Sequence, residues 1–132
     1  MYLLDTDTII YSLKGNEAVR QNLNKRVLES IKISAITLME LYYGAHKSQK
    51  VESNIAKIKA IENSLEVMAI NPELSEIFGM LKSQLEKKGT PLDDFDLIIA
   101  STALTYNLTL VSNNERHFRR IDGLKLENWT VG

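Results

Sequence analysis

The chain begins MYLLDTDTII (residues 1–10), and this short stretch decides how the rest of the sequence is interpreted. Residues 2–4 form an apolar run, and Asp5 and Asp7 follow directly at its end. A strand that is buried in a parallel sheet is a continuous apolar run, which places the two carboxylates at the carboxyl end of a core strand. Ligands of open parallel sheets bind outside this end of the strands. The two aspartates therefore indicate a functional site if other strands bring polar side chains to the same edge.

Strands alternate with helices along the whole sequence. Periodicity and turn residues predict strands at residues 2–4, 31–35, 65–70, 109–112 and, at an edge, 125–129. They predict helices at residues 8–14, 16–30, 37–48, 50–64, 72–88 and 95–107, with a loop or short helix at 113–120. This order predicts an α/β fold, in which helices flank a central, mostly parallel sheet of four to five strands.

Composition narrows the class of protein. The 132 residues suit a single domain, and 44% hydrophobic with 25% charged residues are ordinary globular values. No apolar stretch approaches the roughly 20 residues that cross a bilayer, and no basic segment precedes an apolar one at the N-terminus, so we expect neither membrane insertion nor secretion. The absence of cysteine excludes disulfides and thiolate zinc sites and favours an intracellular, cytoplasmic protein.

A net charge of −1 means that the chain as a whole is not an electrostatic binder of nucleic acid. A polyanionic partner needs a local basic patch, and the densest one follows the fourth predicted strand. It contains Arg116, Arg119 and Arg120, which could grip RNA but could equally form a solvated turn. His117 lies between them, and we interpret it as a solvated surface histidine that has no metal-binding partner at helical spacing.

Acidic and amide side chains follow several of the predicted strands. The candidate set is Asp5 after the first strand, Glu40 after the second, Asp96 at the start of the apolar helix and the neutral Asn114 after the fourth strand. Carboxylates that converge in one cleft repel each other, and a divalent cation removes that cost. Mg²⁺ and Mn²⁺ prefer such oxygen ligands. We predict that Asp5 and Asp96 hold the cation.

The remaining candidates support this site. Glu40 would orient a water, and the Thr6 and Ser112 hydroxyls, with Asp7 beside them, would position carboxylates and waters. The set as a whole predicts metal-assisted hydrolysis of a phosphodiester.

Each acidic residue also has a purely structural interpretation. Asp5 or Asp7 can cap the helix that follows the first strand, and for Asp7 we favour the structural role. Glu40 can complete a capping box with Thr37, although its place inside the apolar run ITLMELYYG favours a function. Asp96 sits in a first helical turn, where the helix dipole stabilises an anion.

At this point the chain resembles a known family, the PIN-domain ribonucleases, and within it the VapC-type toxins of toxin–antitoxin pairs. Four stretches carry the resemblance, in the family's order: YLLDTDTIIYSL, ISAITLMELYYGA, GTPLDDFDLIIASTAL and LTLVSNNERHFRRIDGLKLENW. They span nearly the whole chain, while the central helices, about residues 45–85, match only in kind. The resemblance implies a three-layer PIN-like fold over residues 1–132.

The resemblance also assigns roles. The family's three acids fall on Asp5, Glu40 and Asp96, and its fourth position falls on Asn114, where many members have aspartate. The amide removes one negative charge and leaves open whether one or two metal ions bind. The family implies Mg²⁺- or Mn²⁺-dependent endonucleolytic cleavage of RNA, a homodimer, and inhibition by a small antitoxin protein that plugs the acidic cleft.

Two other classes of function stay open on sequence grounds. The opening DTDT (residues 5–8) also fits the D-x-D-x-T motif of haloacid-dehalogenase-like phosphatases, in which the first aspartate is a nucleophile. That family needs an acidic pair after a later strand, and SNNE (residues 112–115) lacks it. The other class is a non-catalytic RNA- or protein-binding PIN module. A mere binder of polyanions gains nothing from clustered carboxylates.

Overall fold

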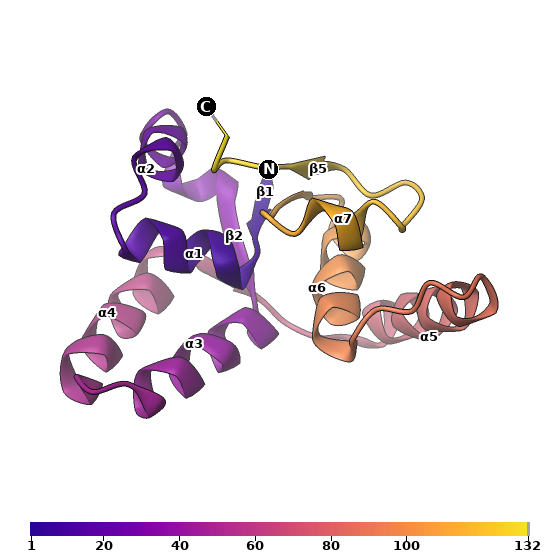
Figure 1. Ribbon diagram of the computed structural model, residues 1–132, viewed down its shortest axis with the longest axis horizontal. Coiled ribbons are helices and arrows are strands. Elements are labelled where there is room, and N and C mark those ends of the chain that lie inside the picture. The colour runs from indigo at the N-terminus through magenta and orange to yellow at the C-terminus, as the bar shows by residue number, and fades with distance from the viewer. Residues whose placement is uncertain (132) are drawn as a thin grey trace.

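Five short strands form one sheet in the computed structural model, which describes residues 1–131. They are β1 (Tyr2–Leu4), β2 (Ile31–Ser34), β3 (Glu66–Met68), β4 (Thr109–Val111) and β5 (Leu126–Glu127). Their spatial order is β3-β2-β1-β4-β5, and every pairing is parallel. The first strand thus lies at the centre of the sheet, with β2 and β4 on its two sides, so the carboxyl ends of these three parallel strands lie next to one another. Figure 1 shows β1 beside β2.

Helices make the connections between the strands. The helices are α1 (Thr6–Leu13), α2 (Glu17–Asn24), α3 (Ala35–Lys47), α4 (Val51–Ser64), α5 (Pro72–Lys87), α6 (Asp94–Thr105) and α7 (Glu115–Phe118), with a 3₁₀ turn at Leu28–Ser30. In Figure 1, α1 to α4 gather on one side of the strands, and α5 and α6 lie on the other. No helix within residues 1–131 combines the length and apolarity that a membrane crossing requires.

Two hydrophobic cores, one on each face of the sheet, give the fold its three layers. Successive strand residues point to opposite faces. Leu3 accordingly packs with Leu110 and with α5 and α6, whereas Leu4 packs with Val111 and with α1 to α4. All four side chains are at most 1% exposed. The predicted α/β fold with a parallel sheet between helical layers is confirmed.

Two local predictions were wrong. The helix predicted at residues 16–30 ends at Asn24. Its apolar spacing predicted that Val27 and Leu28 would continue the buried face, but they are 66% and 57% exposed, so no buried face extends the helix past Asn24. Thr37 does not cap α3: the helix begins earlier, and the Ser34 hydroxyl accepts the hydrogen bond from the Thr37 amide at 3.0 Å.

Candidate active site

An open cavity of about 410 Å³ lies at the carboxyl end of the central strands. Its lining consists of Asp5, Thr6, Asp7, Ile10, Glu40, Asp96, Asn113 and Asn114. These residues come from the β1–α1 junction, from α3, from α6 and from the segment after β4. The four candidate residues predicted from the sequence are therefore brought to one place, although up to 109 positions separate them.

Asp5 is buried where β1 ends, and both of its carboxylate oxygens accept hydrogen bonds. The Thr6 amide donates to Oδ1 at 2.8 Å, and the Ser112 hydroxyl donates to Oδ2 at 2.7 Å. Burial raises the pKa of Asp5 to about 7, and the negative charge of Asp7 adds to the shift. Asp5 caps α1, as its structural interpretation predicted, and it also lines the cavity.

Asp7 ties the segment after β4 to the start of α1. Its Oδ2 accepts from the Asn113 amide at 3.1 Å, and its Oδ1 accepts from the Thr8 hydroxyl at 3.2 Å. Of the two caps that the sequence left open for α1, Asp5 and not Asp7 is the one observed. Burial raises the pKa of Asp7 as well.

Glu40 reaches the cavity from the first half of α3. Its Oε1 accepts a hydrogen bond of 2.7 Å from the Thr6 hydroxyl, so the polar partner of Glu40 lies 34 residues away. The structure thus gives Glu40 a partner across the cavity in place of the capping box with Thr37 that we had weighed. This contact agrees with the predicted role of Thr6 in positioning a carboxylate.

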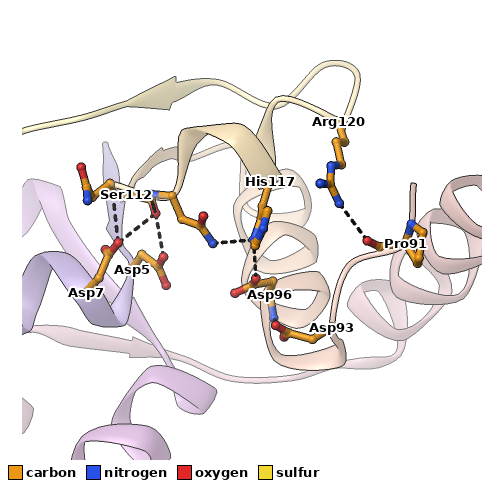
Figure 2. A network of polar contacts seen from close by, with 10 residues as sticks. Asp5, Asp7, Pro91, Asp93, Asp96, Ser112, His117 and Arg120 are labelled. Carbon is orange, nitrogen blue, oxygen red and sulfur yellow. Dashed lines mark hydrogen bonds and ion pairs between the residues drawn. The ribbon is translucent and has the colours of Figure 1, made fainter. Parts of the chain in front are cut away.

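Asp96 lies in the first turn of α6, where its amide donates to the capping Asp93 side chain at 2.9 Å. Burial raises the pKa of Asp96 to about 6, and the negative charge of Asp93 raises it further, while His117 in its protonated form opposes the shift of this pKa. Figure 2 shows Asp96 and Asp5 on opposite sides of the site, with the segment after β4 between them.

Sequence reasoning missed the part played by His117. Its Nδ1 lies 2.8 Å from the amide nitrogen of Asn114 and 3.7 Å from Oδ2 of Asp96. The spacing of Asn114 and His117, three residues apart after a strand, was a signal for the first contact, because such residues share a helix face. The contact with Asp96 depends on the packing of α7 against α6, which no local pattern contains.

The predicted basic patch does not line the cavity. Arg120 donates to the main-chain oxygen of Pro91 at 2.9 Å, and Arg119 pairs with Glu115 at 3.1 Å (Figure 2 shows the first contact). Arg116 is exposed to solvent. All three arginines stay candidates for contacts with RNA, and Arg120 also holds the loop before α6.

The cavity is open and does not form a closed metal cage. Among residues 1–131, no group of three or more acidic or histidine side chains is arranged to hold a metal ion by itself. Mg²⁺ does not require such a cage, because it is usually bound by one or two carboxylates together with waters and substrate phosphates. Asp5, which is buried, and Asp96, which is partly buried, both line the cavity and have raised pKa values, and this fits that kind of site.

Comparison with known proteins decides the family. The model of the PIN domain matches residues 2–124. The chain belongs to the PIN-domain family. It is 38% identical over 129 residues to a protein of Salmonella typhimurium named tRNA(fMet)-specific endonuclease VapC, covering 97% of each chain. It is 39% identical over 131 residues to Ribonuclease VapC2 of Rickettsia felis, covering 98% of each chain.

Solved structures agree with this assignment to the VapC group of PIN domains. The crystal structure of VapBC2 from Rickettsia felis bound to a DNA fragment from its promoter contains a chain that superposes with a TM-score of 0.88. That chain is 38% identical, and the match covers 97% of the present chain and 98% of the other. The resemblance inferred from the four sequence stretches is therefore confirmed over nearly the full length.

Proposed function

We propose that this PIN domain is an Mg²⁺- or Mn²⁺-dependent endoribonuclease, the toxin of a VapBC-type toxin–antitoxin pair that acts on cytoplasmic RNA. One observation carries the proposal: Asp5, Glu40 and Asp96 converge on one cavity from three separate parts of the chain. The names of its full-length relatives, ribonucleases and endonucleases, support the reaction class. The phosphatase alternative is not favoured, because the chain belongs to another family.

Asp5 and Asp96 are the residues that would hold the cation. Burial raises the pKa of each carboxyl, and the negative charges of Asp7 and Asp96 add to the shift of Asp5. When bound there, a divalent cation supplies charge neutralisation at the phosphodiester and activation of a water. Asn114 contributes an uncharged amide at the fourth position, which lowers the negative charge of the cavity and favours one bound ion over two.

The chain's own residues orient the reacting groups. Ser112 and the Thr6 amide hold both oxygens of Asp5, which fixes the direction in which that carboxylate faces the cavity. The Thr6 hydroxyl occupies Oε1 of Glu40, and Oε2 is then the oxygen available to orient the attacking water and accept its proton. Attack in line with the leaving oxygen breaks one P–O bond of the RNA backbone.

An antitoxin segment is the proposed partner. An apolar groove of about 310 Å³ between α1, α3 and α4 adjoins the acidic cavity, and the two share Ile10 and Glu40. Gly44 lies in this groove within α3, and a Cβ at this position would contact nothing within 4 Å. A mid-helix glycine is about 1 kcal/mol less favourable than alanine, so the open space suits a closely packed partner. Solved relatives are toxin–antitoxin complexes.

We also propose a homodimer, built on α3. Met39 and Tyr43 lie one turn apart on this helix and are 58% and 67% exposed, although both side chains are large and apolar. A second copy of the chain would cover them. Light scattering should give twice the mass of one chain, and Tyr43→Lys should reduce it; a wild-type monomer at all concentrations would refute the dimer.

RNA cleavage with defined metals tests the function. The purified chain is incubated with total RNA and with initiator tRNA, the target in the names of the Salmonella and Shigella relatives. We expect cuts at discrete positions with Mg²⁺ or Mn²⁺ and none with EDTA. RNA that stays intact under every metal condition would favour a non-catalytic module. Turnover of p-nitrophenyl phosphate without RNA cleavage would instead favour the phosphatase function.

The antitoxin groove has its own test. Gly44→Ala should leave the free chain as stable or more stable, because alanine favours the helix, and should weaken binding of the antitoxin. Titration calorimetry measures the binding, and Gly79→Ala is the matched control, since it is another open helical glycine outside the groove. Equal binding by the two variants would exclude this groove as the docking site.

A further inference from the structure

Asn114 stands at the start of α7, but its side chain does not cap the helix. Asparagine is among the best N-cap residues, and a side-chain cap typically stabilises a helix by about 1 kcal/mol. Here Asn114 occupies the N-cap position of α7 without a capping hydrogen bond from its side chain. Its amide nitrogen instead lies 2.8 Å from Nδ1 of His117. The contact with His117 therefore takes the place of a cap.

The direction of this hydrogen bond fixes which end of the amide is used. An amide nitrogen only donates, so Nδ1 of His117 is the acceptor, and the neutral ring carries its proton on Nε2. Within residues 1–131, the Asn114 side chain has this one hydrogen bond, and its carbonyl oxygen is left without a protein partner. Asn114 lines the acidic cavity, where an acceptor oxygen is the useful group.

His117 also borders the third carboxylate of the site. Its Nδ1 lies 3.7 Å from Oδ2 of Asp96, whose side chain is 17% exposed. Figure 2 shows His117 extending from α7 toward Asp96 on α6. The imidazole thus stands between the amide of the fourth position and the carboxylate of the third.

We propose that His117 is a positioning residue, which selects the orientation of the Asn114 amide and so presents the carbonyl oxygen to the cavity. An aspartate has two equivalent oxygens and needs no such selection. An asparagine has a donor end and an acceptor end. Only the acceptor oxygen can coordinate a cation or accept a hydrogen bond from a bound water. With His117 in place, the amide oxygen of Asn114 can take the place of the carboxylate oxygen that family members often have at this position. This inference rests on the proposed function of the cavity.

Two substitutions separate the two nitrogens of the ring. In His117→Asn the side-chain oxygen can take the place of Nδ1, and in His117→Gln the side-chain nitrogen can reach the place of Nε2. We expect the asparagine variant to cleave RNA within about threefold of wild type. His117→Gln and His117→Ala should lose about 10- to 100-fold, the usual loss when a residue that orients a metal-site ligand is removed. A fully active glutamine variant beside an inactive asparagine variant would overturn the proposal.

A sharper test compares the effect of His117→Ala in the wild-type chain with its effect in the Asn114→Asp variant. In Asn114→Asp, either orientation presents an oxygen, so His117→Ala should cost less than about threefold there. In the wild-type background the same change should cost about 10- to 100-fold. Equal losses in both backgrounds would assign His117 a role unrelated to the amide and refute the inference.

A measurement without metal or RNA separates this inference from the proposed function. In ¹⁵N-labelled protein at pH 8, an N–H···N hydrogen bond gives a through-bond nitrogen–nitrogen coupling between Asn114 Nδ2 and His117 Nδ1. We expect this coupling in wild type, and none for His46, the exposed second histidine. Its absence in wild type would overturn the inference even if RNA is cleaved, and its presence would uphold the positioning contact even if no RNA is cleaved.

Discussion

Charged side chains at the two ends of β1 lie in opposite kinds of surroundings. At its first residue, Tyr2 packs edge-on against Trp129 with 5.3 Å between ring centroids. The guanidinium of Arg26 lies 4.8 Å and 4.4 Å from the centroids of these two rings, and Glu127 lies 3.8 Å from it. Just beyond the last residue of β1, buried Asp5 faces other carboxylates.

The difference teaches which polar groups serve stability and which serve function. The charge of Arg26 is stabilised by aromatic faces and by an opposite charge, and both favour the folded chain. The charge of Asp5 is opposed by burial and by Asp7, so folding is less favourable when it is ionised. Such an unfavourable arrangement of ionisable groups is typical of a functional site.

The largest expected effect is on catalysis. Asp5→Asn keeps the size of the side chain and removes its charge, so cleavage of RNA should fall by about 1,000-fold, which corresponds to roughly 4 kcal/mol in the barrier. Single-turnover kinetics measure the loss. Asp94→Asn is the matched control, because Asp94 is exposed and pairs with Lys82 on the surface. Unchanged cleavage by the Asp5 variant would remove the proposed site.

The same residue should make stability depend on pH when metal is absent. The folded-state pKa of Asp5 is about 7, above its ordinary value of 3.8, so the folded chain binds the proton more tightly. Its contribution is therefore fully present below about pH 4 and is lost as the pH rises through 7, by up to about 4 kcal/mol. Urea unfolding in EDTA at pH 5 and pH 8 measures it. Asp5→Asn should flatten the profile, and an equally steep profile in that variant would contradict the assignment to Asp5.

The contrast between the two ends explains what the sequence could predict. The carboxyl ends of strands are visible as polar residues after apolar runs, so Asp5 and Asn114 could be found as site candidates from pattern alone. The helical turn that begins at Asp94 likewise identified Asp96. Each of these residues could be found because its position follows from a short stretch of sequence around it.

Long-range partners could not be predicted in this way. The hydroxyl that holds Glu40 comes from Thr6, and the ring that borders Asp96 comes from His117, because the packing of α1 on α3 and of α7 near α6 brings them together. The stacking of Arg26 between Tyr2 and Trp129 joins three distant segments. The residues that follow Arg26 in the sequence, Val27 and Leu28, instead predicted a longer helix, which the structure does not contain.

At the other end of β1, Arg26→Ala should destabilise the chain by about 2–3 kcal/mol, because two stacking contacts and the packing of the side-chain stem are lost. Thermal or urea unfolding measures the change, and Arg20→Ala, an exposed arginine that caps a carbonyl, is the control. Cleavage per folded molecule should stay at the wild-type rate. A loss of activity without a loss of stability would mean that this end also belongs to the site.

The smallest expected effect separates stacking from ion pairing at that end. Glu127 is 43% exposed, and its Oε1 accepts from the indole of Trp129 at 3.0 Å as well as facing Arg26. Glu127→Gln keeps an acceptor for the indole and removes only the charge, so it should cost about 0.5 kcal/mol, the usual contribution of an exposed ion pair. Glu127→Ala should cost more, since the indole also loses its acceptor. A glutamine variant as unstable as Arg26→Ala would show that charge pairing, and not the aromatic faces, holds the guanidinium. The two ends of β1 would then differ only in the charge beside each group, which is opposite in sign for Arg26 and of the same sign for Asp5.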